Sequence, residues 1–82
     1  MNREEVESKV RALMIDELEI EEDTICPEAS LKDDMGIDSL DYVDIVVIID
    51  KVFGFKIKPE DMTGVKTFGQ FCDYIERKVN NL

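Results

Sequence analysis

"DSLDYVDIVVIIDKVFG", residues 38–54, is the stretch that decides the fold, because it predicts one long central helix. Asp38 is a typical N-cap residue. Asp41 stands at the third helical position, where its negative charge faces the positive end of the helix dipole. Gly54 is the kind of residue that ends a helix in the left-handed conformation. We therefore predict a helix over residues 39–53.

A helix is predicted on each side of this central one. Asn2 is expected to cap a first helix that ends near Glu19, and its apolar residues fall on one face. Thr67 and Gln70 fit the capping box of a last helix, which carries a regular apolar stripe.

Residues that interrupt helices define the segments between them. Residues 20–37 predict a long loop that spaced apolar side chains pin to the core, and loops of this length are often functional. Pro59 suits the first position of a short helical turn. The fold class predicted is all-α: a single domain over residues 1–82 with three main helices and one short helix.

The helix over residues 39–53 has apolar residues on more than one face. At about 100° per residue, a broad face expected to pack in the core contains Tyr42, Val43, Ile45, Val46, Ile49 and Phe53. The side that carries Asp41, Asp44 and Lys51 also carries Leu40, Val47 and Ile48. We expect Leu40 and Val47 to be at least partly exposed. Apolar groups rimmed by charge mark a docking surface, and the alternative is a helix buried nearly all round.

The charge of the chain limits its partners and its chemistry. Twenty Asp and Glu against ten Lys and Arg give a net charge of −10, and there is no histidine. Such acidity argues against nucleic acid as a partner and favours proteins with basic patches, although it also serves solubility alone. Without histidine, a Ser-His-Asp or Cys-His catalytic system and a histidine-containing zinc site are excluded. We predict neither a catalytic residue nor a metal site.

Targeting and redox signals point to the cytoplasm. The longest apolar run has five residues, 45–49, which is far below the length of a membrane span, and the start of the chain is charged. Cys26 and Cys72 have no metal-type spacing and are expected to be reduced thiols. We expect a cytoplasmic monomer that does not insert into membranes.

Ser39 stands between two aspartates at the first turn of the central helix. There its hydroxyl is expected to be accessible, close to the unpaired amides that favour a phosphate group at a helix N-terminus. Asp38 and Asp41 would partly oppose that phosphate. The simple alternative is that serine is common at helix starts and acts here only as a cap or a kinase site.

The stretch "LKDDMGIDSLDYVDIVVIIDKVFGF", residues 31–55, closely resembles the acyl carrier proteins of fatty acid and polyketide synthesis. The positions that carry the resemblance are Leu31, Asp34, Met35, Gly36, Asp38, Ser39, Leu40 and Phe53. The final "TFGQFCDYI" segment also matches, and the resemblance covers the whole chain. It implies a four-helix bundle that catalyses nothing itself.

The resemblance further implies that 4′-phosphopantetheine, taken from coenzyme A by a phosphopantetheinyl transferase, is attached covalently to Ser39. Its thiol would carry acyl groups as thioesters to ketoacyl synthases, reductases, dehydratases and acyltransferases. The growing chain often shelters in the bundle interior of such proteins. The residues that match partner contacts in the family are Asp38, Leu40, Asp41, Asp44, Val47 and Asp50.

Several alternatives remain open on the sequence alone. Lys51 and Val52 stand where many fatty acid carriers have further acids, so a dedicated carrier for a polyketide, a specialised lipid or an aminoacyl group is a second reading. The acid at position 38 favours acyl over aminoacyl cargo. A calcium sensor is disfavoured, because a calcium loop counted back from Gly36 lacks ligands at its first and fifth positions. A fourth reading, an interaction module without a prosthetic group, explains the exposed apolar residues of the central helix. It does not explain why the whole chain resembles acyl carrier proteins.

Overall fold

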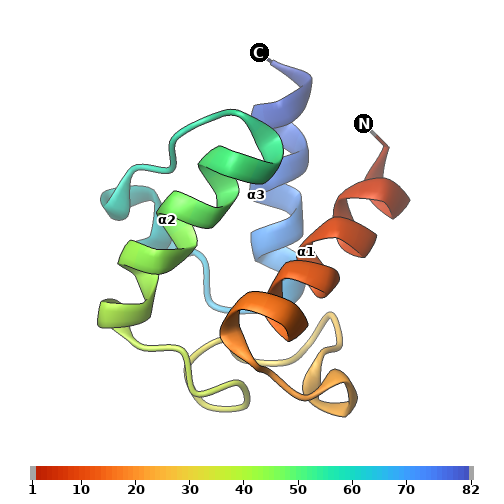
Figure 1. Ribbon diagram of the computed structural model, residues 1–82, viewed down its shortest axis with the longest axis vertical. Helices are drawn as coiled ribbons and strands as arrows, with labels where there is room; N and C mark the ends of the chain where they lie inside the picture. Colours follow the sequence, from red (N-terminus) through yellow and green to blue (C-terminus); the bar gives the residue numbers. More distant parts are fainter. Residues whose placement is uncertain (1, 82) are drawn as a thin grey trace.

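The computed structural model describes residues 2–81, without the side chains of Ser39 and Pro59. Three α-helices form the bundle, and two short 3₁₀ helices lie in the connections (Figure 1). In chain order the elements are α1 (Arg3–Leu18), η1 (Glu22–Thr24), α2 (Ser39–Phe53), η2 (Pro59–Gly64) and α3 (Phe68–Asn80). The all-α class with three main helices is confirmed.

The helix ends follow the capping residues that the sequence predicts. Asn2 accepts a hydrogen bond from the Glu5 amide at 2.8 Å, and α1 ends one residue before Glu19. Thr67 and Gln70 form the expected capping box at the start of α3. Gly54 ends α2 with φ +80°, a conformation that glycine adopts without the steric cost of a side chain.

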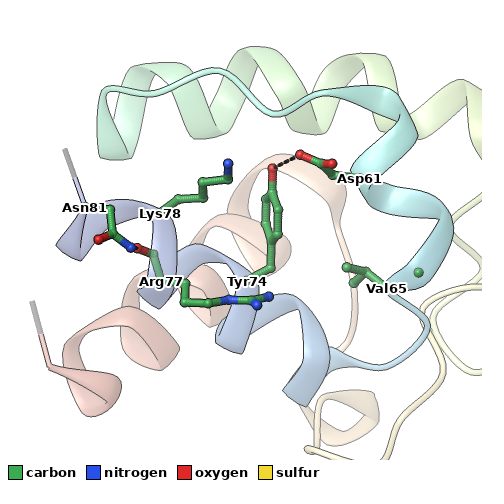
Figure 2. A pocket seen from close by; sticks show the side chains of 7 residues that line it. Asp61, Val65, Tyr74, Arg77, Lys78 and Asn81 are labelled. Atoms are coloured by element: carbon green, nitrogen blue, oxygen red, sulfur yellow. Dashed lines mark hydrogen bonds between the residues drawn. The ribbon is translucent and has the colours of Figure 1, made fainter.

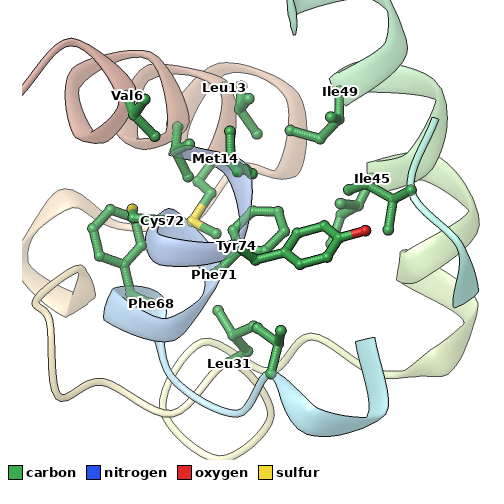
Figure 3. Close-up of a cluster of buried hydrophobic side chains, with 14 of the residues drawn as sticks. Val6, Leu13, Met14, Leu31, Ile45, Ile49, Phe68, Phe71, Cys72 and Tyr74 are labelled. Carbon is green, nitrogen blue, oxygen red and sulfur yellow. The ribbon is translucent and has the colours of Figure 1, made fainter. Parts of the chain in front are cut away.

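Apolar side chains from all three α-helices meet in one core (Figure 3). The fully buried side chains include Val6, Val10 and Met14 of α1, Ile45 and Ile49 of α2, and Phe68, Phe71, Cys72 and Ile75 of α3. In Figure 1, α1 lies beside both α2 and α3. Cys72 is fully buried and packs as a small apolar residue, and this burial raises the pKa of its thiol to about 12.

Arg3 joins the first turn of α1 to α3. Its guanidinium forms an ion pair with Asp73, lies 3.9 Å from a Glu76 oxygen and donates to the Gly69 carbonyl at 3.2 Å. It also pairs with Glu7 at 3.3 Å. The start of α1 is thereby held against the first and middle turns of α3.

The long loop between α1 and α2 is pinned to the core, as predicted. Ile20, Ile25, Leu31 and Ile37 are buried along it. The Leu31 amide donates to the Lys66 carbonyl at 2.9 Å, just before α3 begins. The one-turn helix η1 within this loop was not predicted; its sequence, Glu-Asp-Thr, carries no capping or periodic signal.

One residue of α2 lies on the opposite face from the one predicted. Val43 was expected in the core, but 66% of its surface is exposed. On a helix it lies roughly 140° from the line through Ile45 and Ile49, on the same side as Leu40 and Val47. The core-facing side of α2 is therefore narrower than the sequence pattern suggested.

Candidate functional site

The turn before α2 is built by hydrogen bonds within residues 30–37. The Asp34 carboxylate accepts from the Ser30 amide at 2.7 Å, and the Ile37 amide donates to the Leu31 carbonyl at 2.8 Å. Gly36 has φ +72°, a left-handed conformation that disfavours other residues. The buried side chains of Leu31 and Ile37 hold both ends of the turn against the core. The first residue of α2 thus follows directly on an anchored segment.

Asp38 and Asp41 form a reciprocal capping box at the start of α2. The Asp38 carboxylate accepts from the amides of Leu40 at 2.9 Å and Asp41 at 3.2 Å. In return, the Asp41 carboxylate accepts from the Asp38 amide at 3.2 Å. Ser39 is the first helical residue inside this box, so its backbone is fixed from both sides.

The capping box changes one expectation for Ser39. Two of the amides at this helix end already donate to Asp38, so they are not unpaired donors for a phosphate. The side chain of Ser39 lies outside the described part of the chain, and the accessibility of its hydroxyl stays a prediction. Its neighbours Asp38 and Leu40 are exposed.

The space around this turn suits a bulky covalent substituent. A side-chain carbon added at Gly36 would meet no atom within 4 Å. Leu40 is 79% exposed, so the first turn of α2 is not covered on that side. The surroundings of residue 39 therefore fit a long flexible group, such as phosphopantetheine, that leaves the helix start without displacing packed atoms.

The outward face of α2 carries an apolar stripe with acids beside it. Leu40, Val43 and Val47 follow one another at helical spacing and are all more than half exposed. Asp44 and Asp50 are exposed next to them. The exposure predicted for Leu40 and Val47 is confirmed, whereas Ile48 is half-buried against the core. Hereafter, "the α2 outer face" means Leu40, Val43, Asp44, Val47 and Asp50.

The remaining predicted contact residues lie elsewhere on the helix. Asp41 is half-buried and its carboxylate is engaged in the capping box, so it lies on the flank of the helix. Asp38 is exposed at the helix start, before the stripe begins. Val43 was missed as a surface residue, although its spacing from Leu40 and Val47 was a readable signal.

A hollow of about 410 Å³ opens beside the first turns of α2. Tyr42 forms its α2 side, and Leu31, Met62 and Val65 supply buried apolar groups on the opposite sides. Lys32 and Lys66 stand in its polar rim. Because Tyr42 follows residue 39 by three positions, this hollow lies one helical turn from the start of α2.

A second hollow, of about 470 Å³, lies where η2 meets the end of α3 (Figure 2). There the Tyr74 hydroxyl donates to the Asp61 carboxylate at 2.8 Å, and the Lys78 ammonium lies 5.7 Å from the ring centroid. Burial, together with the Asp61 hydrogen bond and charge, raises the pKa of Tyr74 to about 12. None of the residues that line this hollow belongs to α2. We assign it to the packing of η2 on α3.

Among the helices of residues 2–81, none combines the length and the apolar character that crossing a bilayer requires.

Comparison with known proteins places this arrangement among carriers of a prosthetic group. The family described as "Phosphopantetheine attachment site" matches residues 8–75. An acyl carrier protein of Thermotoga maritima is 40% identical over 78 residues, which cover 95% of this chain and 96% of that protein. One from Thermosynechococcus vestitus is 35% identical over 79 residues, covering 96% and 98%. One from Porphyromonas gingivalis is 39% identical over 75 residues, covering 92% and 96%.

Proposed function

Because the chain belongs to the acyl carrier protein family, we propose that Ser39 is the residue to which its 4′-phosphopantetheine arm is attached. The protein carries acyl groups and is not itself an enzyme. When bound, the arm supplies a terminal thiol that holds the acyl group as a thioester. The observation that carries the proposal is the position of Ser39 inside the Asp38–Asp41 capping box, at the start of an anchored helix.

The residues around Ser39 hold the attachment point and leave the arm free. Attachment forms a phosphodiester at the serine oxygen and releases the nucleotide half of coenzyme A. Since Asp38 already accepts from the Leu40 and Asp41 amides, these donors do not bind the phosphate of the arm. The Asp38 and Asp41 carboxylates also repel that phosphate. We therefore expect the arm to swing from a fixed origin.

The α2 outer face is proposed as the docking surface for enzymes that load or use the arm. Its exposed valines and Leu40 supply apolar contact, and Asp38, Asp44 and Asp50 supply negative charge. Partners with a basic patch around an apolar contact fit this surface, and the net charge of −10 steers them toward it. Such partners are the phosphopantetheinyl transferase, ketoacyl synthases, reductases, dehydratases and acyltransferases. Asp41 contributes by capping the helix and adds charge from its flank.

The hollow beside Tyr42 is proposed as the shelter for the first carbons of an attached acyl chain. Its buried groups, Leu31, Met62 and Val65, are apolar, and its mouth lies one turn from the attachment residue. Apolar burial favours a hydrocarbon chain there over water. Amide NMR shifts at these three residues are expected to change between the arm-bearing protein and its octanoyl form. Unchanged shifts there would contradict the shelter.

The setting proposed for the protein is bacterial-type fatty acid synthesis in the cytoplasm. The free thiols of Cys26 and Cys72 agree with a reducing compartment. We propose one carrier domain over residues 1–82 and a monomer in solution. A dedicated polyketide, lipid or aminoacyl pathway is the second candidate, favoured by Lys51 within α2. Loading by a malonyl transferase and elongation by a fatty acid ketoacyl synthase would support the first candidate and exclude the second.

Intact mass after loading tests the attachment site. The purified chain is incubated with coenzyme A, magnesium and a phosphopantetheinyl transferase of broad specificity. One arm is expected to add to the wild type and to Ser8→Ala, a control at another exposed serine, while Ser39→Ala stays unmodified. An unmodified wild type beside an active control carrier, or a modified Ser39→Ala, would refute the assignment.

A further inference from the structure

The short helix η2 stands between the two hollows described above. Met62 and Thr63 line the hollow that is proposed to shelter the acyl chain. Asp61 and Gly64 line the other hollow, which lies against the end of α3, and Val65, directly after η2, lines both. The helix η2 is therefore one wall of the proposed shelter and has a second hollow on its other side.

Few polar interactions hold η2 against the rest of the protein. Within residues 2–81, its backbone hydrogen bonds stay inside segment 58–65, and hydrogen bonds in a 3₁₀ helix have poorer geometry than those in an α-helix. In this described part of the chain, one side-chain hydrogen bond joins η2 to another element: the Tyr74 hydroxyl of α3 donates to the Asp61 carboxylate at 2.8 Å (Figure 2). Hydrogen bonding from the Lys58 backbone, directly before η2, acts on the same hydroxyl.

Apolar contacts also hold η2, but these contacts can be exchanged. Met62 is fully buried and packs in the core. Because apolar attraction is non-directional and methionine is flexible, Met62 can replace contacts with the core by contacts with a methylene chain. The Tyr74–Asp61 hydrogen bond is directional, and O–H···O bonds keep their oxygen atoms within roughly 2.5–3.0 Å. This hydrogen bond therefore opposes a displacement of η2 that the apolar contacts alone would permit.

Tyr74 is the fixed side of this hydrogen bond. Its ring is buried on α3, and the ring centroid lies 6.5 Å from that of Phe55. The Phe55 ring in turn lies 6.4 Å from the ring of Phe53 at the end of α2. These aromatic contacts tie Tyr74 to the two long helices. Asp61 is half-buried on the short η2, so η2 is the side that moves when the hydrogen bond breaks.

Resting on the proposed carrier function, we propose that the Tyr74–Asp61 hydrogen bond determines the length of acyl chain that the carrier shelters. With the bond formed, η2 is held in place and the hollow receives the first carbons of the chain. A longer chain enters further only by displacing η2, which the hydrogen bond opposes. Tyr74 and Asp61 are positioning residues in this role, because neither lines the hollow that receives the chain.

Four variants test the pair, and circular dichroism verifies the fold of each. Tyr74→Phe and Asp61→Ala each remove the hydrogen bond. Asp61→Asn keeps an oxygen acceptor and removes only the charge, which shares its hollow with the cations of Arg77 and Lys78. Glu60→Ala is the matched control, because it removes a negative charge from an exposed position of η2 and leaves the hydrogen bond in place.

Each protein receives an octanoyl or a hexadecanoyl arm from the matching acyl-coenzyme A and a transferase of broad specificity. Hydroxylamine then cleaves the thioester, and intact mass gives the rate. A sheltered chain holds its thioester against the protein and slows this cleavage. The measured quantity is the ratio of the hexadecanoyl rate to the octanoyl rate, which reports how well the longer chain is sheltered relative to the shorter one.

The ratio is expected to fall roughly fivefold in Tyr74→Phe and in Asp61→Ala, because a net hydrogen bond no longer opposes entry of the longer chain. Asp61→Asn and Glu60→Ala are expected to stay within about twofold of wild type, since both keep the bond. The double variant, Tyr74→Phe with Asp61→Ala, is expected to match the single variants, because all three lack the same bond. A role in stability alone would lower the free energy of unfolding and leave the ratio unchanged.

The outcomes separate this inference from the carrier function. A wild type that accepts no arm at Ser39 refutes the carrier assignment, and this inference with it. A loaded protein whose ratio is the same in wild type and Tyr74→Phe overturns the role of the hydrogen bond alone. An equal fall in Glu60→Ala or Asp61→Asn also overturns it, since charge would then be the cause. Tyr74→Phe keeps the buried ring, so it decides the question if Asp61→Ala does not fold.

Discussion

Replacing Asp38 with alanine is expected to lower the free energy of unfolding by about 1 kcal/mol. The change removes the acceptor of two amide hydrogen bonds, from Leu40 at 2.9 Å and Asp41 at 3.2 Å. Because Asp38 is exposed, water replaces the lost acceptor, so the cost is that of a helix cap and not that of a buried unpaired donor. Loss of a negative charge from a chain of net charge −10 also relieves repulsion, which offsets part of the cost.

Asp38→Asn is the matched control, because asparagine removes the same charge and still caps the helix. Its free energy of unfolding is expected to stay within about 0.5 kcal/mol of wild type. Asp41→Ala removes the hydrogen bond from the Asp38 amide. In the double variant, Asp38→Ala with Asp41→Ala, the loss in free energy of unfolding is expected to be about 0.5 kcal/mol smaller than the sum of the losses in the two single variants. Urea unfolding followed by circular dichroism measures the wild type and the four variants.

The same variants separate capping from charge at the attachment site. Both Asp38 variants lose the charge, so any extra loss of transferase loading in Asp38→Ala reports the cap alone. Hydrogen exchange of the Leu40 and Asp41 amides is expected to speed up in Asp38→Ala and not in Asp38→Asn. The reasoning is refuted if the two variants are equally stable and protect these amides equally.

Three substitutions and one labelling experiment test other parts of the fold. Gly69→Ala is expected to lower the free energy of unfolding by about 1 kcal/mol, because the added carbon would lie 3.0 Å from the Pro27 carbonyl oxygen; greater stability would contradict this. Arg3→Ala is expected to cost about 1 kcal/mol at low salt and less in 1 M NaCl, and a loss insensitive to salt would argue against its ion pairs. The raised pKa of Tyr74 means that its contribution to stability is full below pH 10 and is lost between about pH 10 and 12, so Tyr74→Phe is expected to flatten the fall of stability in that range. Cys72, with its pKa raised to about 12 by burial, is expected to react with thiol reagents at pH 8 only on unfolding, as mass spectrometry of the native and urea-treated protein will report.

Local signals predicted the helix boundaries well, because each cap is decided by a few neighbouring residues. Asn2, Asp38, Gly54 and Thr67 all act at helix ends as their types suggest. The exposure of Leu40 and Val47 also followed from helical spacing, since a domain of this size cannot cover every side of a helix that is apolar nearly all round.

Features that depend on distant segments were not predictable in the same way. Nothing near Arg3 in the sequence indicates its partner, because Arg3 joins α1 to Asp73, which is 70 residues away in the chain. Two hollows that share Glu17 of α1 and Val52 of α2 in their walls exist only because the two helices lie side by side. Val43 was placed in the core because the apolar residues of α2 cover most of its circumference, which leaves the edge of the buried side undefined by sequence.

The capping box at one end of α2 and Gly54 at the other give this helix a fixed length. Its 15 residues span about 22 Å, and the buried side chains of Ile37 and Phe55 clamp the chain just outside both ends. The α2 outer face and the attachment residue belong to the same rigid helix. An enzyme that binds the outer face therefore also fixes the distance and direction from which the acyl group enters its active site. Inserting one residue after Asp41 would rotate Ser39 and its arm by about 100° relative to the rest of the outer face. Transfer of the acyl group to a partner enzyme would then fail, although partner binding and loading of the arm would both survive.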